Sequence, residues 1–249
     1  MLREERHQLI LHWLRNEQKV VATDLIHRLQ VSEDTVRRDL RELDKAGLLR
    51  RVHGGALLIG PPLVDFDERR NVAASTKTLL AKKALQLVHN GQVILIDGGT
   101  TNVQFALHLP LDLHATVITN SPPITDALKS HPHIDVILLG GQLYKHSMVT
   151  LGASTMESLN DIKVDLYVLG VYHLHPQTGI SYPNQEEALV KRKMISVATE
   201  VAALATSDKL SSVSSFIAAP ASALTYLITE EQIESNLVDP YLQLHITVL

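Results

Sequence analysis

The chain has 249 residues, of which 45% are hydrophobic and 20% are charged, so it has the composition of a folded protein rather than a disordered or collagen-like one. It contains no cysteine, which excludes disulfides, cysteine-based zinc sites and thiol catalysis. The net charge of −4 is unevenly spread, because residues 1–56 hold 11 Lys and Arg against 9 Asp and Glu. An acidic body with a mildly basic head is typical of a small polyanion-binding module on a larger domain.

The length and hydropathy also set expectations about location. At roughly 150 residues per domain, the chain should form one or two domains. No uninterrupted apolar run approaches the roughly 18 residues of a membrane-spanning helix. The first residues, MLREERHQ, are charged and lack the apolar core of a signal peptide. We therefore expect a cytoplasmic protein with no membrane partner.

Three helices are predicted near the N-terminus. Residues 3–16 carry apolar side chains at helical spacing, and a shorter helix is expected at residues 22–29. A three-residue turn then leads to a helix over residues 33–46. Ser32 is placed to cap the start of this third helix, and Gly47 is placed to end it with a left-handed residue.

The third helix has two opposite faces. Its apolar stripe consists of Val36, Leu40 and Leu43, whereas Arg38, Arg41 and Lys45 fall almost opposite. Residues 48–56 then suggest a two-stranded wing with two more arginines around a glycine turn. An isolated arginine row is more often a solvated helix face. On the second helix of a short pair, followed by a basic wing, it indicates a helix that enters the major groove of DNA.

The run VSEDTVRRDLRELDKAGLLRRVHGGA resembles the winged helix-turn-helix of the DeoR family of bacterial transcriptional regulators. That family has a valine–serine cap, then T-x-R-R-D-L and G-x-L-x-R-x-H-G-G-A. The resemblance implies a DNA-binding domain over residues 1–57. With the exposed row included, the expected DNA contacts are Ser32, Thr35, Arg37, Arg38 and Arg41 on the helix and Arg50, Arg51 and His53 at the wing. The sequence leaves open which arginine contacts a base.

A connector should separate this domain from a larger one. Gly60-Pro61-Pro62 interrupts any regular element, so we assign residues 58–73 to a linker and residues 74–249 to the second domain. The first helix of that domain is expected at residues 73–88, with Lys77, Lys82 and Lys83 on its outer face.

Short apolar runs then alternate with helical stretches. The predicted strands are 93–96, 117–119, 136–139, 166–169, 201–205, 226–229 and 246–248. Continuous apolar strands separated by helices are typical of a mainly parallel sheet covered on both faces. The fold class is therefore α/β, a winged helix-turn-helix followed by a Rossmann-like domain.

Ligands of such sheets bind beyond the carboxyl ends of the strands. The first strand runs into Asp97-Gly98-Gly99-Thr100-Thr101-Asn102, which precedes a helix and is a candidate phosphate-binding loop. It matches neither the P-loop nor G-x-G-x-x-G, so an ordinary tight turn stays an equal alternative. By spacing alone, Glu187 and Lys191 suggest a surface ion pair, and Lys209 suggests a solvated lysine.

The segments ILIDGGTT, VITNSPPI, VILLGGQL and EEALVKRKMI are similar to the sensor domain of DeoR-type regulators, which resembles ribose-5-phosphate isomerase and CoA transferases in fold. The resemblance covers about residues 3–230 and implies a site for a phosphorylated sugar or similar anionic metabolite. The implied effector residues are Asp97, Gly98, Gly99, Thr100, Thr101, Asn120, Ser121, Glu187, Lys191 and Lys209. Two segments depart from the family pattern, since GVYHL replaces G-A-x-G after Gly170 and ATSDK replaces A-D-x-x-K before Lys209.

We therefore predict a regulator, most simply a repressor of carbohydrate-metabolism genes, that binds operator DNA as a homodimer or homotetramer. One alternative is a sugar-phosphate isomerase-like enzyme with a DNA-binding head, but no second convergent base is evident. Another is a nucleoid-type DNA binder, which the negative net charge disfavours. We expect no cofactor and no metal, because the pairs His131/His133 and His173/His175 lack an evident third ligand.

Overall fold

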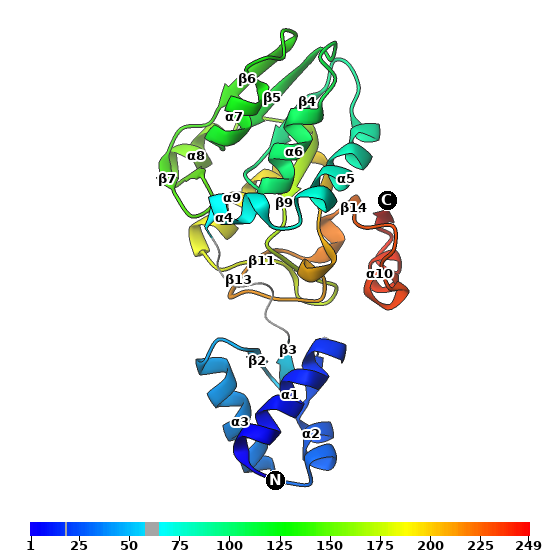
Figure 1. Cartoon of the computed structure of the whole chain (residues 1–249). Coiled ribbons are helices and arrows are strands. Elements are labelled where there is room, and N and C mark those ends of the chain that lie inside the picture. Colours follow the sequence, from blue (N-terminus) through cyan, green and yellow to red (C-terminus); the bar gives the residue numbers. More distant parts are fainter. Residues whose placement is uncertain (18, 58–64) are drawn as a thin grey trace.

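The computed structural model describes residues 1–17, 19–57 and 65–249 (Figure 1). The predicted break at Gly60-Pro61-Pro62 lies outside these residues. The N-terminal domain consists of α1 (Arg3–Glu17), β1 (Lys19–Val21), α2 (Ala22–Leu29), α3 (Glu33–Lys45), β2 (Arg50–Val52) and β3 (Gly55–Leu57). The three helices lie within one residue of their predicted bounds. Within the described residues, no helix is both long enough and apolar enough to span a bilayer.

Local sequence explains the helix-turn-helix. The Ser32 hydroxyl accepts a hydrogen bond from the backbone N–H of Thr35 at 3.3 Å, so Ser32 caps α3 as predicted. Gly47 has φ of +70° just beyond the end of α3. The apolar stripe Val36, Leu40 and Leu43 is buried against residues of α1 and α2. Strand β1 was not predicted; it pairs with β3, so the wing sheet has the order β1-β3-β2.

A buried ion pair fixes α3 against α1. Arg6 donates from its guanidinium to both carboxylate oxygens of Asp39, at 2.7 and 3.0 Å, and Asp39 has no exposed surface. Burial alone would raise the pKa of Asp39, but the adjacent Arg6 holds that pKa below its usual value. A bidentate pair of this kind sets the orientation of α3, and with it the direction in which the opposite, exposed face points.

The C-terminal domain contains a large sheet, two smaller sheets and helices. Its helices are α4 (Phe66–Asn71), α5 (Ala74–Ala84), α6 (Thr100–His108), α7 (Pro122–Leu128), α8 (Ala153–Ser158), α9 (Gln185–Val197) and α10 (Ser235–Leu242). Short 3₁₀ helices span Leu85–Leu87, Ser207–Lys209 and Ala221–Ala223. The strands of the large sheet are β4 (Val93–Ile96), β5 (Ala115–Thr119), β6 (Ile134–Leu138), β9 (Val164–Gly170), β12 (Ala198–Leu204), β14 (Tyr226–Ile228) and β15 (Thr247–Val248). The other strands are β7 (Gln142–Tyr144), β8 (Val149–Leu151), β10 (His173–His175), β11 (Gly179–Tyr182) and β13 (Phe216–Ala219).

The large sheet has seven strands in the order β15-β14-β12-β9-β4-β5-β6, and every neighbouring pair is parallel. The chain starts at β4, builds the sheet to one side through β5 and β6, and then continues on the other side from β9. Strands β4 and β9 are therefore the point at which the strand order reverses. Open α/β sheets bind ligands at that point, beyond the carboxyl ends of the two strands.

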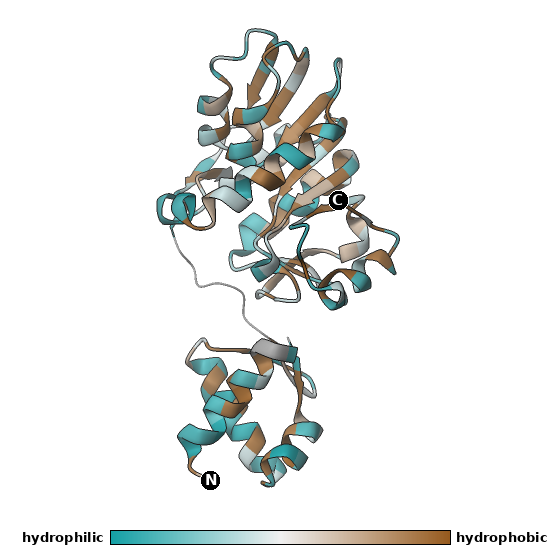
Figure 2. Cartoon of the chain, turned by 45° about the vertical axis from the view of Figure 1, so that its right-hand side comes forward, coloured by the Kyte–Doolittle hydropathy of each residue, from teal (hydrophilic) through white to brown (hydrophobic). Residues whose placement is uncertain are grey.

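Two apolar layers cover the faces of the sheet. Alternate strand residues pack on α5, α6 and α7 on one face, and on α8, α9, α10 and the smaller sheets on the other. Figure 2 shows the corresponding pattern, with largely hydrophobic strands beside helices in which hydrophilic residues alternate with hydrophobic ones. The predicted α/β fold, with a winged helix-turn-helix and a mainly parallel sheet, is confirmed.

Three features differ from the sequence predictions. The short antiparallel sheets β7-β8 and β10-β11-β13 were not foreseen. Helix α4 lies within the predicted linker, and its Phe66 is buried against residues of α5 and α6. Lys77, expected on the outer face of its helix, is only 6% exposed, so that expectation was wrong. The domain boundaries themselves stay a prediction.

Candidate functional site

The exposed face of α3 is rich in free arginine. Arg37 pairs with Glu33 one turn earlier at 2.5 Å, whereas Arg38 and Arg41 have no ion pair or side-chain hydrogen bond within the described residues. Both are exposed, and both lie opposite the buried stripe of the helix. Free guanidinium groups on the second helix of a helix-turn-helix suit hydrogen bonding to guanine.

The wing is joined to the end of this helix. The backbone N–H of Arg51 donates to the Asp44 carboxylate at 3.1 Å, which connects β2 to the last turn of α3. Arg50, Arg51 and His53 are all exposed on β2 and the turn after it. The predicted DNA contacts, Ser32 and Thr35 at the start of α3 included, therefore occupy one helix and the wing beside it.

A cavity of about 370 Å³ lies where the strand order of the large sheet reverses. It is bordered by the loop after β4, the end of β9, and helices α4, α5 and α9. Seven of the ten predicted effector residues line it, namely Gly98, Gly99, Thr100, Thr101, Glu187, Lys191 and Lys209. Helix α6 begins at Thr100, so the N–H groups of its first turn, which have no partner within the helix, lie at this cavity.

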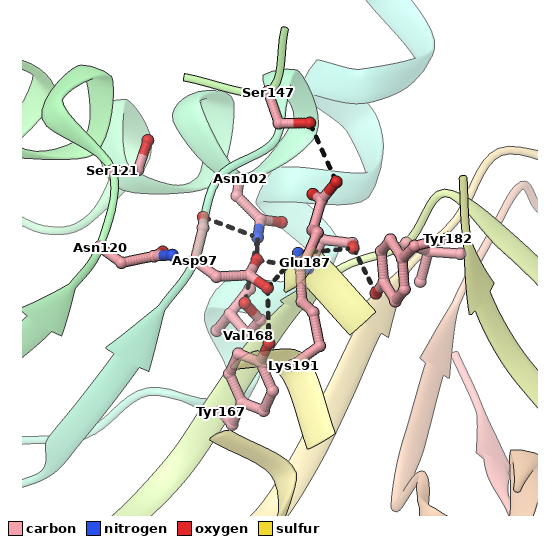
Figure 3. A network of polar contacts seen from close by, with 12 residues as sticks. Asp97, Asn102, Asn120, Ser121, Ser147, Tyr167, Val168, Tyr182, Glu187 and Lys191 are labelled. Atoms are coloured by element: carbon pink, nitrogen blue, oxygen red, sulfur yellow. Dashed lines mark hydrogen bonds and ion pairs between the residues drawn. The ribbon is translucent and has the colours of Figure 1, made fainter. Parts of the chain in front are cut away.

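Asp97 lies beneath the cavity and does not line it. Its carboxylate accepts hydrogen bonds from the Tyr167 hydroxyl at 2.5 Å and the Gly170 N–H at 2.6 Å, and it also binds the ammonium of Lys191 (Figure 3). The Asn102 amide donates to the same carboxylate at 2.9 Å. The Asp97 side chain has no exposed surface, and these four donors surround it. Its side chain therefore joins β4, α6, β9 and α9.

Gly170 has to be a glycine for this arrangement. A Cβ at this position would lie 2.1 Å from the backbone oxygen of Gly98 and 2.7 Å from the Asp97 carboxylate. The backbone oxygen of Gly170 also accepts from Tyr182 at 2.8 Å and from Lys191 at 3.1 Å. The ends of β4 and β9 can come this close only because no side chain separates them.

Glu187 and Lys191 are buried, contrary to the surface pair that their spacing alone suggests. Lys191 is paired with Asp97, whereas Glu187 accepts a hydrogen bond from the Ser147 hydroxyl at 3.3 Å. Burial raises the pKa of Glu187, and the charge of Lys191 opposes that rise. The two side chains provide the cavity with a carboxyl group and an ammonium group on adjacent turns of α9.

Asn120 and Ser121 support the site without lining it. The Asn120 amide donates to the backbone oxygen of Thr150 at 2.9 Å, and the Ser121 hydroxyl donates to that of Met148 at 3.0 Å. No dashed line joins either residue to the Asp97 network in Figure 3. They hold the β7-β8 hairpin, whose connecting segment carries Ser147.

Two lysines in the cavity have no carboxylate partner within the described residues. The pKa of Lys209 is lowered to about 8, chiefly by burial; Asp208 opposes this lowering, and the charges of Lys77 and Arg69 contribute to it. Burial also lowers the pKa of Lys77, with Arg69 as the next cause. Their ammonium groups donate only to backbone oxygens, Lys209 to Val171 at 3.0 Å and Lys77 to Arg69. The cavity therefore concentrates positive charge that no protein anion neutralises directly.

Sequence reasoning missed Arg69, Lys77 and Tyr172 as cavity residues. Arg69 stood in the predicted linker, and Lys77 was placed on the outside of its helix. The departure from G-A-x-G after Gly170 was a usable signal for Tyr172, because it marks a bulky residue where the family has a small one.

The histidine pairs have packing roles. The His131 ring contacts the backbone oxygen of Leu109 at 3.0 Å, and the His133 ring stacks on His114. The His173 ring contacts the Ser214 hydroxyl at 2.6 Å, and the His175 ring accepts from two backbone N–H groups. Within the described residues, the one triad with metal-ligand spacing is His7, Asp39 and Glu42, and there Arg6 already binds both Asp39 oxygens.

Comparison with known families finds two matches, each to a different segment of the chain. The DeoR-like helix-turn-helix domain matches residues 6–61, and the DeoR C-terminal sensor domain matches residues 72–231. The chain belongs to the DeoR family. The protein is thus a DNA-binding transcriptional regulator with a sensor domain, and the resemblance noted in the sequence is confirmed.

Individual relatives agree with this assignment. The transcriptional repressor GlcR of Bacillus subtilis is 34% identical over 92% of this chain and 89% of its own length. The L-fucose operon activator of Haemophilus influenzae is 29% identical over 93% of this chain and 94% of its own. Both are named as regulators of transcription rather than enzymes, which confirms the prediction that this DeoR-family chain is not an enzyme.

A likeness to solved structures concerns the fold alone. Ribose 5-phosphate isomerase A from Neisseria gonorrhoeae matches with a TM-score of 0.40 and 17% identity, over 53% of this chain and 52% of the isomerase chain. The DeoR-family chain thus spans about half the length of that solved chain.

Replacement of Lys191 by methionine would leave the Asp97 carboxylate buried without its cation. Removing one member of a buried pair costs about 3–5 kcal/mol, so we expect Lys191→Met to lower the free energy of unfolding by roughly 3 kcal/mol. Urea unfolding followed by circular dichroism measures this. Lys193→Met, on the same helix but outside the network, is the control and should change stability by less than about 0.5 kcal/mol.

Replacement of Arg38 by alanine tests the arginine face of α3. If Arg38 binds a base, Arg38→Ala should cost about 1–3 kcal/mol of binding to the operator and much less on a scrambled duplex. Gel-shift titrations at one salt concentration measure both affinities. Arg70→Ala, an exposed arginine of the sensor domain, is the control. Unchanged operator affinity in Arg38→Ala would remove this residue from the set that reads sequence.

Proposed function

We propose that this protein is a repressor of carbohydrate-metabolism genes whose operator affinity is controlled by a phosphorylated sugar or similar anionic metabolite. The α3 helix enters the major groove through Arg37, Arg38 and Arg41, and Ser32 and Thr35 lie at its start. The wing residues Arg50, Arg51 and His53 bind phosphates beside that groove. Phosphate contacts supply much of the affinity, which makes binding fall steeply with salt.

The observation that carries the effector half of the proposal is the positive charge inside the cavity. Lys77 and Lys209 lie in one cavity, where no carboxylate among the described residues pairs with them, and burial lowers the pKa of both. Holding unpaired ammonium groups in a partly desolvated site costs free energy, which an anionic ligand offsets. A phosphate monoester has the charge and the acceptor oxygens that these groups and the start of α6 can bind.

The predicted residues divide into two roles under this proposal. Gly98, Gly99, Thr100, Thr101 and Lys209 contact the phosphate, while Glu187 and Lys191 contact hydroxyl groups of the sugar. The other three predicted residues, Asp97, Asn120 and Ser121, position these groups rather than touch the effector.

Regulation requires two arrangements of the protein with different affinity for the effector. We propose that a homodimer or homotetramer places two recognition helices on a palindromic operator, as two-fold symmetric regulators do. Effector binding then releases the DNA in the cytoplasm, where the operator lies. The repressor GlcR, the relative at 34% identity, supports repression by its name.

The proposed function is tested by combining a thermal-shift assay with an operator gel shift. Phosphorylated hexoses should raise the melting temperature, since a ligand at 100 times its Kd adds about 2.7 kcal/mol of stability, whereas the unphosphorylated sugars should not. The operator is obtained by selecting duplexes from random DNA with the protein itself. A phosphorylated sugar that raises the melting temperature should also weaken operator binding.

The double variant Thr100→Val, Thr101→Val should keep operator affinity but lose the response to the phosphorylated sugar. Thr78→Val, on α5 outside the cavity, is the matched control and should respond as the unmodified protein does. A normal response in the double variant would exclude the threonine loop as the phosphate site.

The pKa of Lys209 predicts a pH dependence of effector binding. A pKa of about 8 means that Lys209 is charged at pH 7 and largely neutral at pH 9, whereas a phosphate monoester is a dianion throughout that range. Affinity for glucose 6-phosphate should therefore fall about tenfold from pH 7 to pH 9, as calorimetry would measure. Lys209→Gln should bind more weakly and lose most of this fall, whereas Lys82→Gln, outside the cavity, should keep it.

A further inference from the structure

Arg69 and Tyr172 form a pair of polar groups in the cavity that the family resemblance did not assign. Both side chains line the cavity, and the Arg69 guanidinium lies 5.8 Å from the centre of the Tyr172 ring. Arg69 comes from α4, and Tyr172 lies just beyond the end of β9. The two residues stand far apart in the chain and meet only at this site.

Each of the two side chains has a buried polar atom without a hydrogen-bond partner. The Arg69 Nε and the Tyr172 hydroxyl are both in this state within the described residues, and so is the Thr101 hydroxyl in the same cavity. Tyr172 is 7% exposed and Thr101 is 4% exposed. Buried donors are nearly always paired in folded proteins, so three unpaired ones around a single cavity point to a ligand with several acceptor oxygens.

The charge of Arg69 specifies the ligand further. No carboxylate pairs with Arg69 within the described residues, and its other contacts are the backbone oxygen of His146 at 2.9 Å and the faces of two aromatic rings. Arginine stays protonated in proteins, so the charge cannot be removed by titration. The N–H groups of a guanidinium suit the oxygens of a phosphate.

Several of the contacts that hold helix α4 involve Arg69. The Lys77 ammonium donates to the Arg69 backbone oxygen, the Arg69 side chain reaches His146, and the His146 ring contacts the Asp65 carboxylate at 2.9 Å. Phe66 anchors the start of the helix in the core. Residues 58–64, which join the two domains, directly precede this segment.

We propose that Arg69 and Tyr172 bind a phosphate oxygen of the effector directly, and that α4 is the element of the sensor domain whose mobility the effector changes. The proposal rests on the proposed function, because it concerns the same cavity and the same anion. Arg69 Nε and the Tyr172 hydroxyl donate to the phosphate, and the bound anion then fixes Arg69 and Lys77 together. Effector binding thus acts directly on α4, the first helix after residues 58–64, and no other part of the sensor domain has to transmit its effect.

The test uses inorganic phosphate as the probe and the full-length protein. Calorimetry should show that Arg69→Met weakens phosphate binding at least tenfold and that Tyr172→Phe weakens it about threefold. Arg70→Met removes the adjacent, exposed arginine of the same helix and should leave the Kd within twofold. If Arg69→Met and Arg70→Met bind phosphate equally well, the direct role of Arg69 is disproved.

Hydrogen exchange tests the part played by α4 in the unmodified protein, so that it does not depend on how a variant folds. Phosphate should slow exchange at least fivefold in peptides that cover Phe66–Asn71, both in the unmodified protein and in Arg70→Met. Arg69→Met should lose this protection, and Arg69→Lys, which keeps the charge, should retain part of it. Unchanged exchange over α4 at saturating phosphate would overturn the proposal.

The outcomes also separate this inference from the proposed function. Failure of the unmodified protein to bind either phosphate or phosphorylated sugars would refute the anion cavity as a whole. Phosphate binding that is normal in Arg69→Met, with no protection of α4, would leave the anion cavity in place and remove only Arg69 and α4 from it.

Discussion

The sensor domain depends on one buried carboxylate, that of Asp97. A carboxylate with no contact to water is costly unless donors surround it, and here a lysine, a tyrosine, an amide and a backbone N–H do so. These donors come from α6, α9 and β9, while Asp97 itself follows β4. Four elements that are distant in sequence thus meet at the reversal of strand order, and their positions define the base of the cavity.

This network decides which charges are free to bind a ligand. The Asp97 carboxylate neutralises the charge of Lys191. Lys191 therefore provides the cavity with a fixed hydrogen-bond donor rather than with an unpaired charge. Within the described residues, Lys77, Lys209 and Arg69 have no such partner. Burial is the main cause of the lowered pKa values of the two lysines, and the neighbouring positive charges add to it. The attraction for an anion therefore lies on the α4 and Lys209 sides of the cavity rather than at its base.

The sequence predicted well whatever depends on local pattern and strand composition. The cap at Ser32, the buried stripe of α3 and all seven parallel strands carry such signals, and the loop after β4 could be placed at the edge of the sheet from topology alone. Residues whose roles arise from tertiary contacts were harder to assign. Lys77 looks like a solvated helix lysine until α4 covers it, and Asp97 looks like a ligand contact until its four donors are known.

The small antiparallel sheets were also difficult to predict from the sequence, because they depend on tertiary contacts. Strand β10 is only three residues long, too short for alternation to be a signal, and it contains no β-branched residue. It is nevertheless fully buried, because β11 pairs with it and the helix α9 packs on β11. Such strands form because of how the larger elements pack around them, and this packing cannot be predicted from the local sequence pattern.

In the proposed function, a small ligand in the cavity controls DNA binding, and the division between paired and unpaired charges suggests which groups respond to it. A ligand shifts an equilibrium only by its difference in affinity between two arrangements. Groups that Asp97 already holds in place, such as Lys191, are expected to have nearly the same position in both arrangements, so they contribute mainly to the affinity for the ligand. Under our proposal, groups such as Arg69 and Lys77, which repel each other until an anion binds between them, differ most between the arrangements. Under the proposed function, affinity and regulation therefore depend on groups at opposite sides of one cavity.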